Sequence, residues 1–111
     1  MKKYVLVSLL MVATTAQANV ASWYGGKHHG RKTASGEVFN QYALTAASNV
    51  HKLGSKLKVT NKANGKSVIV RVTDTGGFGK YGRTLDLSKG AFSQIASLSS
   101  GLAKVTIEQL D

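Results

Sequence analysis

Three acidic side chains stand out in this chain because acids are scarce in it. Only 5 carboxylates occur among 111 residues, against 15 Lys and Arg. Glu108 and Asp111 lie at the C-terminal end, which leaves Glu37, Asp74 and Asp86 in the body of the chain. Carboxyl groups can act as general acids and bases. We therefore expect these three acids to have a chemical role.

Asp74 and Asp86 lie on either side of a glycine-rich loop. The mostly β-branched run 68–72 predicts a strand that leads to Asp74. Residues 75–82 hold four glycines together with Phe78 and Tyr81, and a short extended piece then leads to Asp86. Two carboxylates beside an aromatic loop could present acids to a bound polymer chain. The alternative is that both aspartates only form turns or anchor the loop, as Asp commonly does.

Short strands separated by glycine-rich turns must position these acids. Strands are predicted at 20–24, 44–47, 56–61, 67–73 and 104–110. Asn64-Gly65 is the strongest two-residue hairpin signal in the chain and is expected to pair 56–61 with 67–73. Ser88 is a candidate N-cap for a helix that runs to about Ser97. This pattern predicts a small β-barrel, which has no free strand edge.

The apolar positions of these strands and of the helix define an expected core. That core consists of Val59, Val68, Val70, Val72, Leu85, Leu87, Ile95, Val105 and Ile107.

Residues 1–18 have the three parts of a secretory signal peptide. A basic start is followed by an apolar run, too short to span a bilayer, and by Ala16-Gln17-Ala18 as a cleavage signal. The alternative is a buried N-terminal helix. We expect residues 19–111 to form one domain that is soluble and periplasmic or secreted. The chain has no cysteine, so neither a disulfide nor a lipid anchor on a cysteine is expected.

The strongly basic composition suggests an anionic partner. The formal net charge is +10, and loss of Lys2 and Lys3 with the leader would leave +8. Such a balance fits nucleic acid, a membrane surface or an acidic wall polymer. Export favours the wall over nucleic acid, and the basic residues are scattered along the chain. A generally solvated basic surface is the alternative.

Three long segments of the chain resemble the rare lipoprotein A family of bacterial cell-wall proteins. They read ASWYGGKHHGRKTASGEVFNQYALTAAS, LGSKLKVTNKANGKSVIVRVTDTGGF and GRTLDLSKGAF. The resemblance covers Ala21 to about Gly90. It implies a mainly β fold, a small six-stranded double-psi β-barrel with one or two short helices. It also implies an endolytic lytic transglycosylase, which cleaves peptidoglycan glycan strands to 1,6-anhydro ends without water.

The resemblance places the family's acids on Glu37, Asp74 and Asp86. In expansins and membrane-bound lytic transglycosylases, which share the barrel, the aspartate matching Asp86 is the one most tied to sugar chemistry or binding. We expect the three carboxyls to meet in one open groove, with Asp86 or Asp74 as the proton donor and Glu37 as its partner. The family usually has a histidine after LTAA, whereas this chain has Ser48.

Several further side chains are candidates for contacts with sugar. The substrate-binding candidates are Tyr24, Ser48, Phe78, Tyr81 and Arg83. Trp23 could stack on a sugar ring or pack in the barrel. His28, His29 and His51 show no recognisable spacing to a second ligand pair, so no metal is expected, and no cofactor either.

The predicted partner is the glycan strand of peptidoglycan, with no nucleic acid, and the protein is expected to be a monomer. Two other functions are compatible with the sequence. A non-catalytic, expansin-like module would bind the wall without cutting it, and Ser48 at the histidine position favours this alternative. A structural protein of the division septum or of a wall-spanning machine is the second. Release of anhydro-ended fragments from purified sacculi would identify the enzyme.

Overall fold

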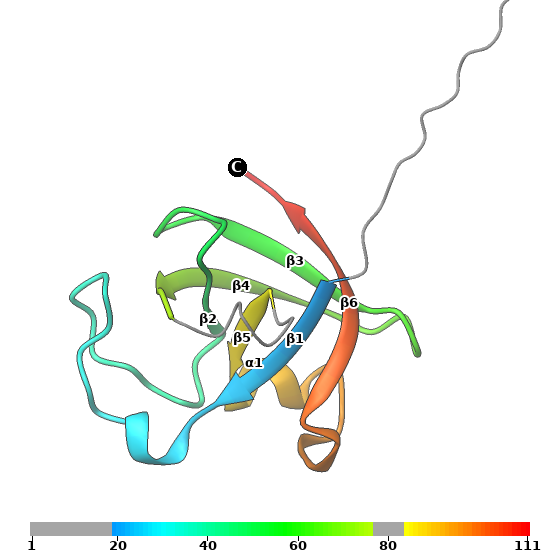
Figure 1. Ribbon diagram of the computed structural model, residues 1–111, viewed down its shortest axis with the longest axis horizontal. Coiled ribbons are helices and arrows are strands. Elements are labelled where there is room, and N and C mark those ends of the chain that lie inside the picture. The colour runs from blue at the N-terminus through cyan, green and yellow to red at the C-terminus, as the bar shows by residue number, and fades with distance from the viewer. Residues whose placement is uncertain (1–18, 77–83) are drawn as a thin grey trace, which may run out of the picture.

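The described residues of this computed structural model, 19–76 and 84–111, form a closed barrel of six strands. The strands are β1 (Asn19–Tyr24), β2 (Thr45–Ala47), β3 (Lys56–Asn61), β4 (Ser67–Asp74), β5 (Leu85–Ser88) and β6 (Leu102–Gln109). Around the barrel they follow the order β1-β5-β2-β4-β3-β6 (Figure 1). The pairs β1–β5 and β2–β4 are parallel, and the other neighbours are antiparallel. The predicted mainly β, six-stranded barrel is confirmed.

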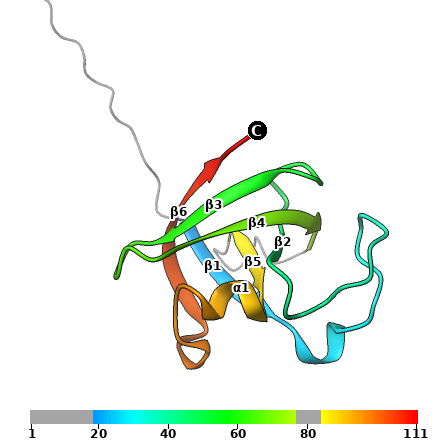
Figure 2. The ribbon, with the colours of Figure 1, turned by 180° about the vertical axis from the view of Figure 1, so that it is seen from behind.

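One short α-helix packs against the end of the barrel. Helix α1 (Lys89–Ser93) follows β5 directly (Figure 2). The Ser88 hydroxyl caps the helix by accepting a hydrogen bond from the Ala91 backbone N–H at 3.1 Å. The N-cap was predicted correctly, but the helix ends at Ser93 rather than near Ser97. Beyond the helix, the Ile95 carbonyl accepts hydrogen bonds from the side-chain amides of Asn61 and Asn64.

Strands β3 and β4 form the predicted hairpin with Val59 opposite Val68. The turn is longer than the two-residue Asn-Gly turn predicted, since Asn61 N–H donates to the Lys66 carbonyl across a four-residue loop. Among the described residues only glycines have positive φ, and Gly65 adopts φ 76°. Asn64 therefore does not take the left-handed conformation of a type I′ turn. Its side chain instead bonds Lys66 N–H and the Ile95 carbonyl.

Apolar side chains fill the barrel, as the alternation in the strands predicts. Of the expected core residues all are buried except Ile107, which is partly buried and packs against the others. Leu57 and Phe92 were not predicted, yet both are fully buried. Phe92 comes from α1 and closes the core together with Ile95. In the described part of the chain no helix is long and apolar enough to cross a membrane.

The segment 25–44 joins β1 to β2 and stands out to one side of the barrel in both views (Figures 1 and 2). It contains the short 3-10 turn η2 (Gly26–His28), while a second one, η4 (Leu98–Ser100), precedes β6. An antiparallel bridge between Lys32 and Val38 folds the segment back on itself. The segment is anchored on α1, because Gly90 N–H donates to the Gln41 carbonyl at 2.8 Å.

Truncation of Val70 should destabilise the fold. Val70 is 1% exposed at the centre of β4, so Val70→Ala should lower the free energy of unfolding by about 1–3 kcal/mol. The matched control is Ile69→Ala, which removes more atoms from the neighbouring position but from a side chain that is 52% exposed. Chemical denaturation measures both. Equal losses in the two variants would show that the interior of β4 is not central to stability.

Candidate functional site

Asp74 and Asp86 lie on the two sides of the short strand β2. Ala47 is opposite Asp74 in the parallel pair β2–β4 and opposite Asp86 in the antiparallel pair β2–β5. Residues directly opposite one another in a sheet point to the same face. The two carboxyl side chains therefore share one face and one row of the barrel, with backbones two strand spacings apart, roughly 10 Å.

An irregularity in β4 brings Asp74 to this face. Strict alternation would place Asp74 on the side of Val68, Val70 and Val72, inside the barrel. The register shifts, however: Ala46 is opposite Val72 but Ala47 is opposite Asp74, so Thr73 is an extra residue. Because Ala46 faces the core, Ala47 and Asp74 face outward. Such a β-bulge changes the face of the sheet to which the following side chain points.

Backbone groups of two loops hold the Asp74 carboxylate. Its Oδ1 accepts hydrogen bonds from Ala34 N–H at 3.0 Å and from Thr75 N–H at 2.9 Å. Beyond Asp74, the Asn49 side-chain amide bonds both the N–H and the carbonyl of Gly76. No hydrogen bond to Asp74 Oδ2 occurs within the described residues. One carboxyl oxygen is thus fixed, while the other remains available to a ligand.

Asp86 is held from the neighbouring strand β1. Ser22 lies opposite Asp86 in the parallel pair β1–β5, and its hydroxyl donates a hydrogen bond to Asp86 Oδ1 at 2.9 Å. Sequence reasoning did not find Ser22, because 64 residues separate it from Asp86 and only the barrel closure brings the two strands together. The serine gives the carboxylate a defined orientation on the outer face.

Tyr24 lies at the same face, near both aspartates. Its ring stacks on Phe39 with the centroids 4.5 Å apart and meets His28 edge-on at 5.7 Å. Burial, followed by the negative charges of Asp74 and Asp86, raises the pKa of the Tyr24 phenol well above its ordinary value of 10.0. The phenol therefore stays protonated. Its buried oxygen has no hydrogen-bond partner in the part of the chain that the structure describes.

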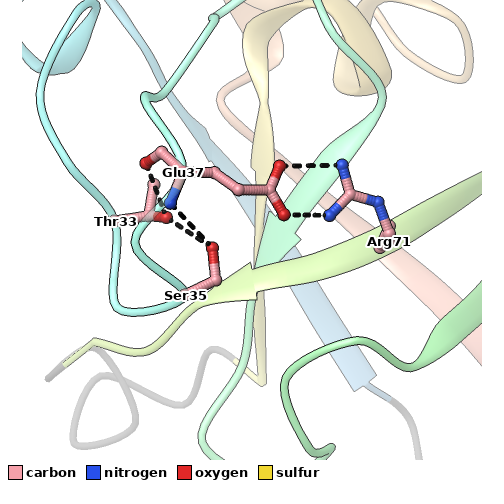
Figure 3. A network of polar contacts seen from close by, with 4 residues as sticks. All are labelled: Thr33, Ser35, Glu37 and Arg71. Atoms are coloured by element: carbon pink, nitrogen blue, oxygen red, sulfur yellow. Dashed lines mark hydrogen bonds and ion pairs between the residues drawn. The ribbon is translucent and has the colours of Figure 1, made fainter.

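Glu37 pairs with Arg71 rather than with the two aspartates. Both guanidinium Nη atoms donate to its two carboxylate oxygens, and Nη2 lies 2.9 Å from Oε1 (Figure 3). These hydrogen bonds lower the pKa of Glu37 from its ordinary value of 4.5. The turn that carries Glu37 is closed by the Thr33 hydroxyl, which donates to the Glu37 carbonyl at 3.0 Å. The ion pair attaches this turn to β4, and the same turn supplies the Ala34 N–H that holds Asp74.

Of the remaining predicted site residues, the structure describes Ser48. Ser48 is 1% exposed, and its hydroxyl oxygen accepts hydrogen bonds from the Val50 and His51 N–H groups. Its backbone N–H donates to the Asp74 carbonyl at 2.9 Å, so Ser48 continues the β2–β4 pairing beside the site. Phe78, Tyr81 and Arg83 lie outside the described residues.

A pocket of about 160 Å³ lies next to the Glu37–Arg71 ion pair. Glu37 and Arg71 line it together with Thr73 of the β4 bulge and with Phe39, which also stacks on Tyr24. Sequence reasoning missed Arg71 and Thr73; the only signal was the alternation of β4, which points Arg71 outward. No group of three His, Cys, Asp or Glu side chains within 19–76 and 84–111 is arranged to hold a metal ion.

The sequence pattern of the lytic transglycolase family matches residues 16–107. A probable endolytic peptidoglycan transglycosylase RlpA from Synechocystis is 50% identical over 92 residues, which are 83% of this chain and 28% of the relative. The endolytic peptidoglycan transglycosylase RlpA of Neisseria meningitidis serogroup A is 48% identical over 99 residues, which are 89% of this chain and 41% of the relative. The chain thus spans less than half the length of these relatives.

The fold also occurs in solved structures. The Streptomyces papain inhibitor superimposes with a TM-score of 0.69 at 21% identity, over 87% of this chain and 96% of the inhibitor. At this identity the likeness concerns the barrel fold.

The Glu37–Arg71 pair should make stability depend on pH. The folded-state pKa of Glu37 is lowered, so the pair stabilises the fold above pH 4.5, and this stabilisation is lost as pH falls through the folded pKa. Glu37→Gln should therefore lower the melting temperature at pH 7, slightly because the pair is exposed, and the difference should close as the pH falls through the lowered pKa of Glu37. In an Arg71→Gln background the same substitution should have no effect. A pH-independent loss that persists in that background would contradict the assignment.

Proposed function

The chain belongs to the lytic transglycolase family, and from this premise we propose that it cleaves the glycan strands of peptidoglycan as an endolytic lytic transglycosylase. The observation that carries the proposal is the outward row of β2, where Asp74 and Asp86 flank Ala47. The names of its relatives support the substrate class.

Asp74 is the proton donor of the proposed reaction. Its Oδ1 is fixed by two backbone N–H groups, which leaves Oδ2 to approach the glycosidic oxygen. Proton transfer to this oxygen breaks its bond to the anomeric carbon. The 6-hydroxyl oxygen of the same sugar then bonds to the anomeric carbon and gives its proton to the Asp74 carboxylate. The acid is regenerated, and no water is consumed.

Asp86, Tyr24 and Glu37 have supporting roles in this proposal. Asp86, oriented by the Ser22 hydroxyl, stabilises the positive charge that develops on the sugar ring. The neutral phenol of Tyr24 lies beside both carboxyls and adds no charge. Glu37 is a positioning residue, because its ion pair with Arg71 holds the turn that donates Ala34 N–H to Asp74. In this proposal the partner acid of Asp74 is Asp86, whereas the sequence predicted Glu37 in that role.

We further propose that residues 1–18 are a signal peptide and that residues 19–111 work as a monomer outside the cytoplasmic membrane. The basic, apolar and small-residue parts of the leader support export. The proposed substrate lies in the same compartment. Closure of the barrel supports the monomer, because a closed sheet presents no free edge for pairing with a second copy.

Substitution of the acids should separate catalysis from folding. Asp74→Asn should lower the release of 1,6-anhydro products from purified sacculi by ~10²–10⁴-fold, since it removes the proton donor. Asp86→Asn should also lower product release, while both variants keep a cooperative thermal unfolding transition. The control is Glu108→Gln, which changes an exposed carboxyl on β6. Products are measured by chromatography and mass spectrometry.

Three other outcomes would contradict this function. Full activity of both variants would remove the catalytic roles of Asp74 and Asp86. Retention of the wild-type protein on sacculi without any anhydro product would select the expansin-like binding module. Unfolding of both variants would identify the aspartates as turn and loop anchors.

Salt should weaken capture of the wall if the basic surface contributes to it. Lys56 and Lys58 project from the outer side of β3, where exposed charges are screened at high ionic strength. We expect Lys58→Gln to lower sacculus binding at low salt and to have little effect at 1 M NaCl, where the Debye length is about 3 Å. Lys58→Arg, which keeps the charge, should bind as the wild type does. Binding of the wild type that is indifferent to salt would remove this role.

A further inference from the structure

The pocket lined by Glu37 and Arg71 includes neither Asp74 nor Asp86, and the mechanism above uses only the Glu37–Arg71 pair of its lining. Its volume of about 160 Å³ is smaller than the roughly 300–1,000 Å³ of pockets that hold a whole small-molecule ligand. It therefore fits a substituent of a larger ligand better than a sugar ring. Phe39 lines the pocket and stacks on Tyr24, which lies near Asp74 and Asp86, so the aromatic pair connects the pocket to the face that carries these two acids.

One part of the pocket is apolar. Val38, Phe39 and Ala43 line it, and these side chains offer methyl, methylene or aromatic surface. Phe39 is 4% exposed and is held by its stacking on Tyr24, whereas Val38 is 62% exposed at the pocket opening. A small apolar group such as a methyl would lose its contact with water against these three side chains.

The other part of the pocket is polar, and the positive charge of Arg71 is already balanced there by Glu37. The Thr73 hydroxyl has no hydrogen-bond partner in the described part of the chain. Arg71 uses one N–H on each Nη atom for Glu37, and a guanidinium has five N–H donors in all. A bound anion would meet the Glu37 carboxylate as well as Arg71, so a neutral hydrogen-bonding group is favoured over a carboxylate.

We propose that this pocket binds the N-acetyl group of an amino sugar in the glycan strand. The methyl packs against Val38, Phe39 and Ala43, and the amide carbonyl accepts a hydrogen bond from the Thr73 hydroxyl or from a remaining Arg71 N–H. The inference rests on the proposed function, because it takes peptidoglycan glycan strands as the ligand. It makes Thr73 contribute twice, through its backbone to the bulge that turns Asp74 outward and through its side chain to recognition of the sugar.

The size of the N-acyl group tests this assignment without a change of charge. Glycan strands are de-N-acetylated and then re-acylated with formyl, acetyl or butyryl groups, all of which give neutral amides. Both the fraction bound and the rate of anhydro-product release are measured for each strand. The wild type should prefer the acetyl strands by about tenfold or more, since one methyl in a fitted apolar pocket has this effect.

A matched pair of variants links the preference to the pocket. Val38→Ala widens the opening and should shift the preference toward butyryl strands. Val50→Ala makes the same change at a side chain that is 74% exposed and does not line the pocket, and it should keep the wild-type preference. Both positions are exposed, so both variants are expected to fold.

The outcomes separate this inference from the proposed function. Equal binding and cleavage of the three strands by the wild type would overturn the pocket assignment and leave the lytic activity in place. The same preference in Val38→Ala and Val50→Ala would also overturn it. Acetyl-selective binding that Val38→Ala alters, without any anhydro product, would support the pocket and refute the catalytic proposal.

Discussion

Apolar side chains fill the six-stranded barrel and leave no room for a carboxylate inside it. The extra residue Thr73 in β4 keeps the Asp74 side chain out of that interior. In the preceding part of β4, the side chains of Val68, Val70 and Val72 point into the core. Without the extra residue, Asp74 would continue this row and bring an ionisable group toward the apolar interior, which is costly. One inserted residue thus satisfies both the packing of the core and the exposure of the acid.

The face that carries Asp74 and Asp86 depends on strands that are distant in sequence. β2 is only three residues long, yet it lies between β4 and β5 and sets Asp74 and Asp86 in one row through Ala47. The parallel partner of β5 is β1, which brings Ser22 to Asp86. Rigid strands hold these groups more narrowly than loops would, which is what proton transfer over hydrogen-bond distances requires.

The chain has few acids, and Glu37 and Asp74 have different roles among them. The guanidinium of Arg71 lies against Glu37, which is therefore held as an anion, and the pair fastens the turn containing Ala34 to β4 (Figure 3). Asp74 receives backbone hydrogen bonds from this turn and from its own loop. The paired carboxylate of Glu37 holds a turn in place. The carboxylate of Asp74 has an available oxygen, which can exchange a proton with a ligand.

The sequence by itself determined five of the six strands and most of the core, and it singled out the three acids as candidates. Alternation of apolar and polar residues is a local signal with period two, so β3, β4 and the positions of Val59 and Val70 could be predicted from it. Only the tertiary structure decided the bulge at Thr73, the partners of Asp86 and Glu37, and the hydrogen bonds between the asparagines of the β3–β4 hairpin and the Ile95 carbonyl. Each of these depends on a contact between residues at least 26 positions apart, as Ala46 and Val72 are. Local propensity carries no information about which distant backbone or side chain will satisfy a polar group, since closure of the barrel makes that choice.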